Sequence, residues 1–288
     1  MQELTIARNQ SGKPHAGKVF AAVHAHLADA PGLAGGLCAK MIAEGYTGYL
    51  IRTTNDETSG GNSSAQNILS NETEHAAMAK ALGFKDVFEL YYCSHRMNEI
   101  SPLELRGRLV LLLRMLKADT VLSYSPSAEG EPDSDHWITG RTVEEACWTA
   151  GLASDFQEHF EAGIMPHTVR ERYWFHARPE QPFNHIVDIS GYIERKIDAM
   201  VECRSQGDGN AGSLLRARLA KEGRRLPLLG ADDRTADRAF ARQFLLDQFR
   251  AYAEGLDCEY AERFQRIAPP AAGNSKLDAY IEKNAVRI

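Results

Sequence analysis

Short apolar runs alternate with segments of helical periodicity along the first two thirds of this chain. Apolar runs of about four to eight residues, bounded by turn-forming residues, are typical of buried β-strands. The pattern predicts strands at Lys18–Ala25, Thr47–Thr54, Asp86–Cys93, Asp119–Pro126, Glu171–Ala177 and His185–Ser190. The last two are expected as outer strands of one sheet.

Between these runs, apolar residues recur at helical spacing and are flanked by start and stop signals, such as Pro31 before one segment and Gly45 after it. Asn71 and Glu74 have the spacing of an N-cap and its partner three residues later. The predicted helices are Pro31–Gly45, Asn71–Gly83, Ser101–Ala118, Thr139–Gly151 and Gly191–Gln206. Strands joined by helices of this length predict a Rossmann-like, three-layer α/β/α fold with a mostly parallel sheet.

The last part of the chain changes character at the glycine-rich segment Gly207–Ser213, after which helical periodicity dominates, notably over Thr235–Gly255. We therefore expect an α/β domain over residues 1–206. Residues 207–288 are expected to form a helical C-terminal extension packed on the same domain.

Composition narrows the class of protein. The 288 residues are 43% hydrophobic and 25% charged, with a formal charge of −6 and no lysine or arginine cluster, which argues against nucleic-acid binding. The longest apolar run, Leu109–Ala118, is too short for a membrane span, and the N-terminal segment does not resemble a signal peptide. Five dispersed cysteines without a CxxC pair suit a reducing compartment. We expect a soluble, cytoplasmic protein.

Polar residues follow two of the predicted strands. His26 and Asp29 come after the first strand, and His136 comes after the fourth. In the common doubly wound order these strands are neighbours at the switch point, where ligands bind. Two imidazoles and one carboxylate, with a further position left to water, are a usual ligand set of catalytic zinc. The residues alone leave a second interpretation open, in which a strand-end histidine is capped by a helix N-cap aspartate.

Several segments resemble, in collinear order, the motifs of the PIG-L/LmbE superfamily. The segment AHLADAPGLAGGLCAKMIAEGY resembles A-H-P-D-D-E followed by a Gly-Gly helix start, and DSDHWITGR resembles H-P-D-H-R-x-x-G-R. TTNDETSG resembles the family's T-x-G-E loop, VDISGYIERKIDAMVECRSQ its late helix, and YAERF a final motif. The superfamily includes zinc-dependent N-deacetylases of N-acetylglucosaminyl and related substrates.

The resemblance implies a metal site, a small-molecule substrate and no nucleic-acid or membrane partner. The family's metal ligands fall on His26, Asp29 and His136, so Zn²⁺ or another divalent metal is the implied cofactor. Relatives commonly assemble as trimers or hexamers, which implies a homo-oligomer here.

Two positions depart from the deacetylase pattern. The family's general base is replaced by Ala28, and the histidine that helps to stabilise the oxyanion is replaced by Asp133. A positioned general base typically contributes about 10²–10⁴-fold to the rate, so its loss requires a substitute or a different reaction.

The residues that could substitute for the base are those expected near the same strand ends. Glu57 after the second strand is the first choice, and Asp135 is expected to orient the neighbouring ligand His136. His176, at the end of the strand Glu171–Ala177, is a further catalytic candidate. His24 points to the same face as His26 but lies deeper, as a core or supporting histidine. Asp133 is the last of the residues that could replace the base.

The H-x-A-D variant of the motif also resembles 4-oxalomesaconate hydratase, a superfamily member that adds water across a carbon–carbon double bond. The sequence is therefore compatible with three functions. The first is a metal-dependent hydrolase of an N-acyl or related C–N bond in a small polar substrate. The second is a metal-dependent hydratase or lyase acting on an unsaturated or keto-acid substrate, which Ala28 favours. The third is a non-catalytic homologue that binds metal or ligand.

Overall fold

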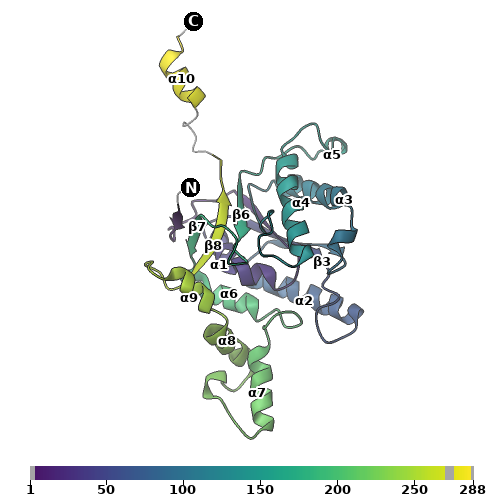
Figure 1. The fold of residues 1–288 in the computed structure, drawn as a ribbon, viewed down its shortest axis with the longest axis vertical. Coiled ribbons are helices and arrows are strands. Elements are labelled where there is room, and N and C mark those ends of the chain that lie inside the picture. Colours follow the sequence, from purple (N-terminus) through teal and green to yellow (C-terminus); the bar gives the residue numbers. More distant parts are fainter. Residues whose placement is uncertain (1–3, 270–275, 287–288) are drawn as a thin grey trace.

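The structure is a computed structural model that describes residues 4–269 and 276–286 (Figure 1). An eight-stranded sheet runs through this part of the molecule. The strand order is β1-β7-β8-β6-β5-β2-β3-β4. The strands are β1 (Thr5–Ala7), β2 (Val19–His24), β3 (Thr47–Thr54), β4 (Asp86–Tyr92), β5 (Thr120–Ser123), β6 (Glu171–Phe175), β7 (His185–Asp188) and β8 (Ala261–Ile267). All predicted strands are present, but β6 and β7 lie inside the sheet and not at its edge, because β8 and β1 pair with them.

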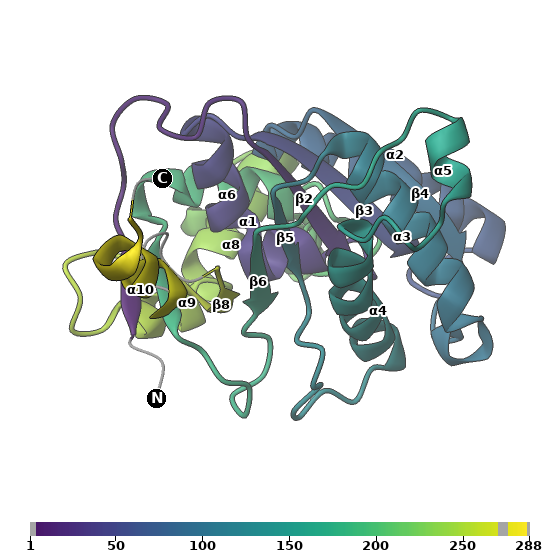
Figure 2. The same cartoon turned by 90° about the horizontal axis from the view of Figure 1, so that it is seen from above.

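Helices cover both faces of the sheet, which confirms the predicted three-layer α/β/α class (Figure 2). On one face lie α1 (Asp29–Ala43), α2 (Ser64–Leu82) and α6 (Ile193–Met200), and on the other lie α3 (Pro102–Leu116) and α4 (Ser134–Ala150). The remaining helices are α5 (Glu158–Glu161), α7 (Ala211–Lys221), α8 (Asp233–Phe244), α9 (Asp247–Ala253) and α10 (Lys276–Asn284). Short 3₁₀ helices occur at Met97–Glu99, Ser190–Tyr192 and Pro227–Leu229.

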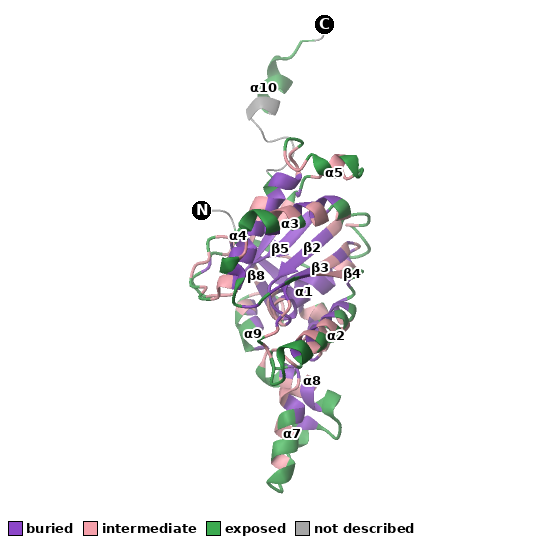
Figure 3. Cartoon of the chain, turned by 90° about the vertical axis from the view of Figure 1, so that its right-hand side faces the viewer, coloured by how far each residue is buried: buried purple, intermediate pink, exposed green. Residues whose placement is uncertain are grey.

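The central strands are buried on both faces, as Figure 3 shows by their purple colour. Because side chains alternate along a strand, Phe20 and Ala22 of β2 pack towards α1, whereas Ala21 and Val23 pack towards α3 and α4. This double burial explains why β2 is a continuous apolar run and not an alternating one.

Helix α2 begins earlier than predicted. A capping box between Ser63 and Gln66 starts the helix at Ser64, two turns before the predicted N-cap, Asn71. Asn71 is instead fully buried within the helix, and its side chain donates a hydrogen bond to the carbonyl of Asp56 (2.8 Å).

The predicted helical extension contains one strand. Residues Ala261–Ile267 form β8, which inserts antiparallel between β6 and β7, although α7, α8 and α9 are helical as expected. The local sequence pattern did not predict this strand, because the strand contains a glutamate, Glu262, whose side chain is fully buried. A charged residue is found at such a position only when a partner elsewhere in the fold neutralises it.

That partner is Lys196 of α6, whose Nζ lies 2.9 Å from Glu262 Oε1. The carboxylate also accepts hydrogen bonds from the backbone N–H groups of Gly36 (2.9 Å) and Leu37 (2.8 Å) in α1. Lys196 Nζ donates to the carbonyls of Pro31 and Gly32 as well. The ion pair between Lys196 and Glu262, with its hydrogen bonds to the backbone of α1, therefore holds α1, α6 and β8 together beneath the carboxyl edge of the sheet.

Among the described residues, no helix combines the length and the apolar character that crossing a membrane requires.

We expect E262Q to lower the free energy of unfolding by about 3–5 kcal/mol, because it leaves the buried Lys196 ammonium without its counter-charge. Urea denaturation measures the change. The matched control is E99Q, which breaks the exposed Arg96–Glu99 pair and should leave stability unaltered. Equal effects of the two variants would contradict the assigned role of Glu262.

Candidate metal centre

The candidate site lies at the switch point of the sheet. Strands β2 and β5 are paired neighbours, and each is followed at its carboxyl end by a loop and a helix, α1 or α4. His26 lies in the turn after β2, Asp29 begins α1, and His136 lies in the first turn of α4. The three residues predicted as metal ligands are therefore brought to one place.

The facing atoms of these three residues form a tight triangle. His26 Nδ1 lies 3.0 Å from His136 Nε2, and Asp29 Oδ2 lies 3.4 Å from the first of these atoms and 3.6 Å from the second. Protein donors bind zinc at about 2.0–2.2 Å, so two donors to one ion are at most about 4.3 Å apart. All three separations meet this limit, so the residues fit a divalent metal.

One carboxylate oxygen of Asp29 positions the whole triangle. Asp29 Oδ2 accepts a hydrogen bond from the backbone N–H of His26 (2.7 Å) and a short one from the hydroxyl of Tyr124. The Tyr124 ring also stacks on the ring of His136, with centroids 4.4 Å apart and an interplanar angle of 10°. Tyr124 directly follows β5, so this contact ties together the ends of both strands.

Each imidazole is oriented by its own carboxylate. His26 Nε2 lies 3.2 Å from the fully buried Asp135, which also accepts backbone N–H groups from His95 (2.5 Å) and Met97 (3.2 Å). Another carboxylate, Glu131, lies 3.1 Å from His136 Nδ1. Carboxylates placed behind histidine ligands in metal sites act in the same way, turning the remaining ring nitrogen towards the metal. Asp135 thus orients His26, and not its chain neighbour His136 as predicted.

The charges of the site favour a cation. Burial lowers the pKa of His26, but hydrogen bonds to Asp135 and Asp29 and the charge of Asp29 raise it overall, to about 11. Burial also lowers the pKa of His136, but the charge of Asp29 and the contact with Glu131 raise it overall. For Asp29, burial is outweighed by His136 and His26, which hold its carboxyl pKa well below the usual range. Without a metal, the carboxylates therefore retain protons on the imidazoles.

A buried polar network supports the turn from behind. His24 Nδ1 lies 2.7 Å from the carbonyl oxygen of His26, and His24 Nε2 lies 3.0 Å from His75. His75 Nδ1 lies 2.5 Å from Glu89 Oε1, and Glu89 Oε2 accepts a hydrogen bond from Arg52 Nε (2.8 Å). His24 is thus a supporting histidine behind the triangle.

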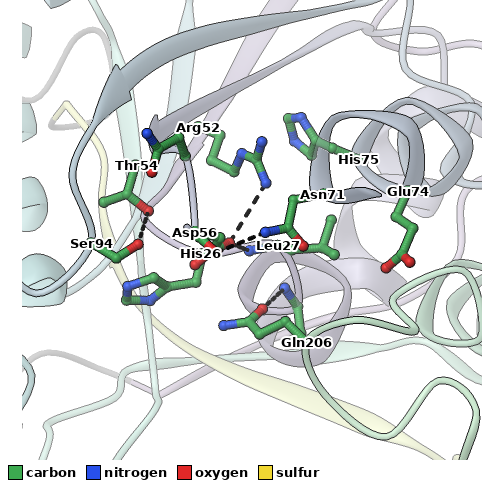
Figure 4. Close-up of polar contacts among 12 residues, drawn as sticks. His26, Leu27, Arg52, Thr54, Asp56, Asn71, Glu74, His75, Ser94 and Gln206 are labelled. Atoms are coloured by element: carbon green, nitrogen blue, oxygen red, sulfur yellow. Dashed lines mark hydrogen bonds and ion pairs between the residues drawn. The ribbon is translucent and has the colours of Figure 1, made fainter. Parts of the chain in front are cut away.

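The two residues between the ligands are also fixed. The backbone N–H of Leu27 donates to Asp56 Oδ2 (2.6 Å), and that of Ala28 donates to Gln206 (2.7 Å; Figure 4). Asp56 is fully buried, adopts a left-handed φ of 55°, and lies 3.6 Å from Arg52. No local pattern indicates this role, because Asp56 belongs to the loop after β3 and not to the turn that it holds.

Ala28 provides no proton acceptor at the position of the family's base. Its methyl group packs on Gly207, where an added Cβ would lie 3.0 Å from Ala28 Cβ, and Gly207 adopts a φ of 88° that favours glycine. An adjacent cavity of about 430 Å³ is lined mainly by apolar residues, including Ala28, Pro31, Val201 and Phe249.

The other two predicted catalytic residues, Glu57 and His176, have different surroundings. Glu57 is at the same edge of the sheet, where its carboxylate accepts the N–H of Ser94 (2.9 Å) and so holds the loop that also donates to Asp135. His176 packs instead against the rings of Phe183 and Tyr252, and burial and Arg263 lower its pKa.

Three further residues lie near the triangle: Glu131 and His95, which the sequence analysis did not single out, and Asp133, which it considered as a substitute base and not as a metal ligand. Glu131 orients His136, and the ring of His95 lies 5.9 Å from the ring of His26. Asp133 offers a carboxylate oxygen within 4.8 Å of donor atoms of His26 and His136. The strand-end rule could have identified His95, because it follows a predicted strand.

Comparison with known proteins agrees with the predicted resemblance. The family model PIG-L, described as GlcNAc-PI de-N-acetylase, matches residues 21–147. No curated protein matches the chain in sequence.

Solved structures share the fold. N,N'-diacetylchitobiose deacetylase from Pyrococcus horikoshii has 21% identity and a TM-score of 0.69, over 91% of this chain and 87% of its own. The 4-carboxy-2-hydroxymuconate hydratase from Pseudomonas putida has 18% identity and a TM-score of 0.63, over 90% and 99%. A conserved protein from Thermus thermophilus has 20% identity and a TM-score of 0.62, over 89% and 98%.

We expect a divalent metal to stabilise the protein more strongly as the pH rises. The pKa of His26 is raised from 6.5 to about 11, so its proton stabilises the metal-free protein below about pH 6.5, and this contribution is lost as the pH rises towards 11. A metal has to displace the same proton, so its affinity rises with pH. The increase in Tm on adding Zn²⁺ to chelator-treated protein should therefore be larger at about pH 8 than at about pH 6.

The matched control is H26A, in which the increase in Tm should be lost at both pH values. A pH-independent increase in the wild type, or an unchanged one in H26A, would contradict the assignment.

Proposed function

We propose that this chain, whose residues 21–147 match the PIG-L family, is a metal-dependent hydrolase of an N-acyl or related C–N bond in a small substrate. The observation that carries the proposal is the triangle of His26, Asp29 and His136, with both imidazoles oriented by buried carboxylates. This is the ligand set of catalytic, not structural, metal sites. When bound, Zn²⁺ or another divalent ion polarises the scissile carbonyl and lowers the pKa of water to about 7.

The residues of the chain then have separate tasks. Asp135 and Glu131 hold the two rings in their binding orientation. Glu57 accepts the proton in place of the base missing at Ala28, because one of its oxygens is held by Ser94 and the carboxylate lies at the same sheet edge. We assign no proton transfer to His176, since its ring packs against those of Phe183 and Tyr252 and makes no contact with the triangle among the described residues.

A hydratase or lyase is the second candidate, and Ala28 is the observation that favours it. Addition of water to an activated double bond needs a polarised carboxylate or carbonyl and an acid–base pair, but not the deacetylase oxyanion histidine, which is Asp133 here. A hydratase from Pseudomonas putida shares the fold. On this candidate, Glu57 and His95 are the groups at the sheet edge that transfer protons.

A substrate panel separates the two reactions. We expect metal-loaded protein to release acetate and free amine from N-acetylated amino sugars, and H26A to release neither, since it loses a metal ligand. A change of ultraviolet absorbance with unsaturated dicarboxylic acids, without amide cleavage, would support the hydratase instead. Activity retained by H26A would contradict both.

We expect E57Q to reduce kcat by about 10²–10⁴-fold, the usual contribution of a positioned base, while leaving bound metal unchanged. Glutamine still accepts the hydrogen bond from Ser94, so the loop should keep its shape. Elemental analysis and steady-state kinetics measure the two effects, and E99Q, which changes an exposed glutamate, is the control. Wild-type kcat in E57Q would exclude Glu57 as the base.

A further inference from the structure

Asp133 uses only one of its carboxylate oxygens for the fold. It is the N-cap of α4, where Oδ1 accepts the backbone N–H of Asp135 at 2.9 Å. Helix capping requires one side-chain oxygen, and serine serves as well as aspartate. Among the described residues the second oxygen, Oδ2, accepts no hydrogen bond, so it is available for another purpose.

This second oxygen faces the candidate metal centre. Asp133 Oδ2 lies 3.9 Å from His136 Nε2, within the limit of about 4.3 Å for two donors to one ion. One ligand atom each of His26, Asp133 and His136 lies within 4.8 Å of the others. Among the described residues, no lysine or arginine forms an ion pair with Asp133, whose side chain is 24% exposed.

The neighbouring carboxylates of Glu131 and Asp135, in contrast, have strong partners. Glu131 is engaged by Arg178 at 2.9 Å, and Asp135 by two backbone N–H groups. Asp133 differs from both, because its second oxygen lies near the imidazole of His136 and forms no ion pair with a described lysine or arginine.

We propose that Asp133 is a fourth protein ligand, so that the metal is held by two imidazoles and two carboxylates. This inference rests on the metal centre of the proposed function. An ion that accepts only four donors would then have no position left for substrate. The site therefore selects a divalent ion that takes five or six donors, such as Mn²⁺, Fe²⁺ or Co²⁺, to which carboxylate and imidazole ligands are suited.

Cobalt substitution tests the proposal, because the visible absorption of Co²⁺ becomes stronger as its coordination number falls. The variant is D133S, which keeps the N-cap but loses the second oxygen. We expect D133S to bind Co²⁺ at least about 10-fold more weakly, measured by chelator competition, and to absorb more intensely than the wild type. The Tm of the metal-free protein should fall only slightly, because serine keeps the cap of α4 and the lost carboxylate is partly exposed.

The matched control is D232S, the same substitution at the N-cap of α8. It should leave both the cobalt affinity and the spectrum as in the wild type. Identical affinity and spectra in D133S and wild type would overturn the proposal while leaving the three-ligand centre intact. A wild-type protein that binds no Co²⁺ or Zn²⁺ would overturn the metal centre itself, and with it the proposed function.

Discussion

The candidate site depends on one carboxylate oxygen, Oδ2 of Asp29. It receives the N–H of His26 from the turn after β2 and the hydroxyl of Tyr124 from the end of β5, and it faces both imidazoles. A helix begins at the same residue, so the positive end of α1 adds to the stabilisation of this charge. A carboxylate that joins two strand ends and one helix can occupy only a narrow range of positions, which is what a metal ligand requires.

The rest of the fold neutralises the charges that this arrangement buries. Asp56 and Arg52 lie behind the turn, Glu89 and His75 extend the network, and Lys196 with Glu262 fixes the helix that carries Asp29. Buried charges are costly unless they are paired and hydrogen-bonded, so these contacts act together as one support for the site. They come from both halves of the chain, which makes the site a property of the whole domain.

Two substitutions relative to the family pattern lie beside the candidate metal centre and leave the triangle of His26, Asp29 and His136 in place. Ala28 removes a proton acceptor, and Gly207 packs against its methyl group. Asp133 replaces a neutral or positive ring by a negative oxygen beside His136. Both changes remove a group that the deacetylase pattern of the sequence analysis requires, namely a general base and a histidine that stabilises the oxyanion. This is why the proposed function assigns proton transfer to Glu57, which lies at the same sheet edge.

The sequence by itself determined the α/β class and the adjacency of the first and fourth predicted strands, and it singled out His26, Asp29 and His136 as candidate ligands, because periodicity and strand-end position are local properties of the chain. It did not reveal β8, since a buried Glu262 is compatible with a strand only when Lys196 lies opposite. Nor could it assign Asp135 to His26 and Glu131 to His136, or turn Asp133 towards the metal centre. Those choices depend on distances across the loops, and only the packing of the strand ends and helices decides them.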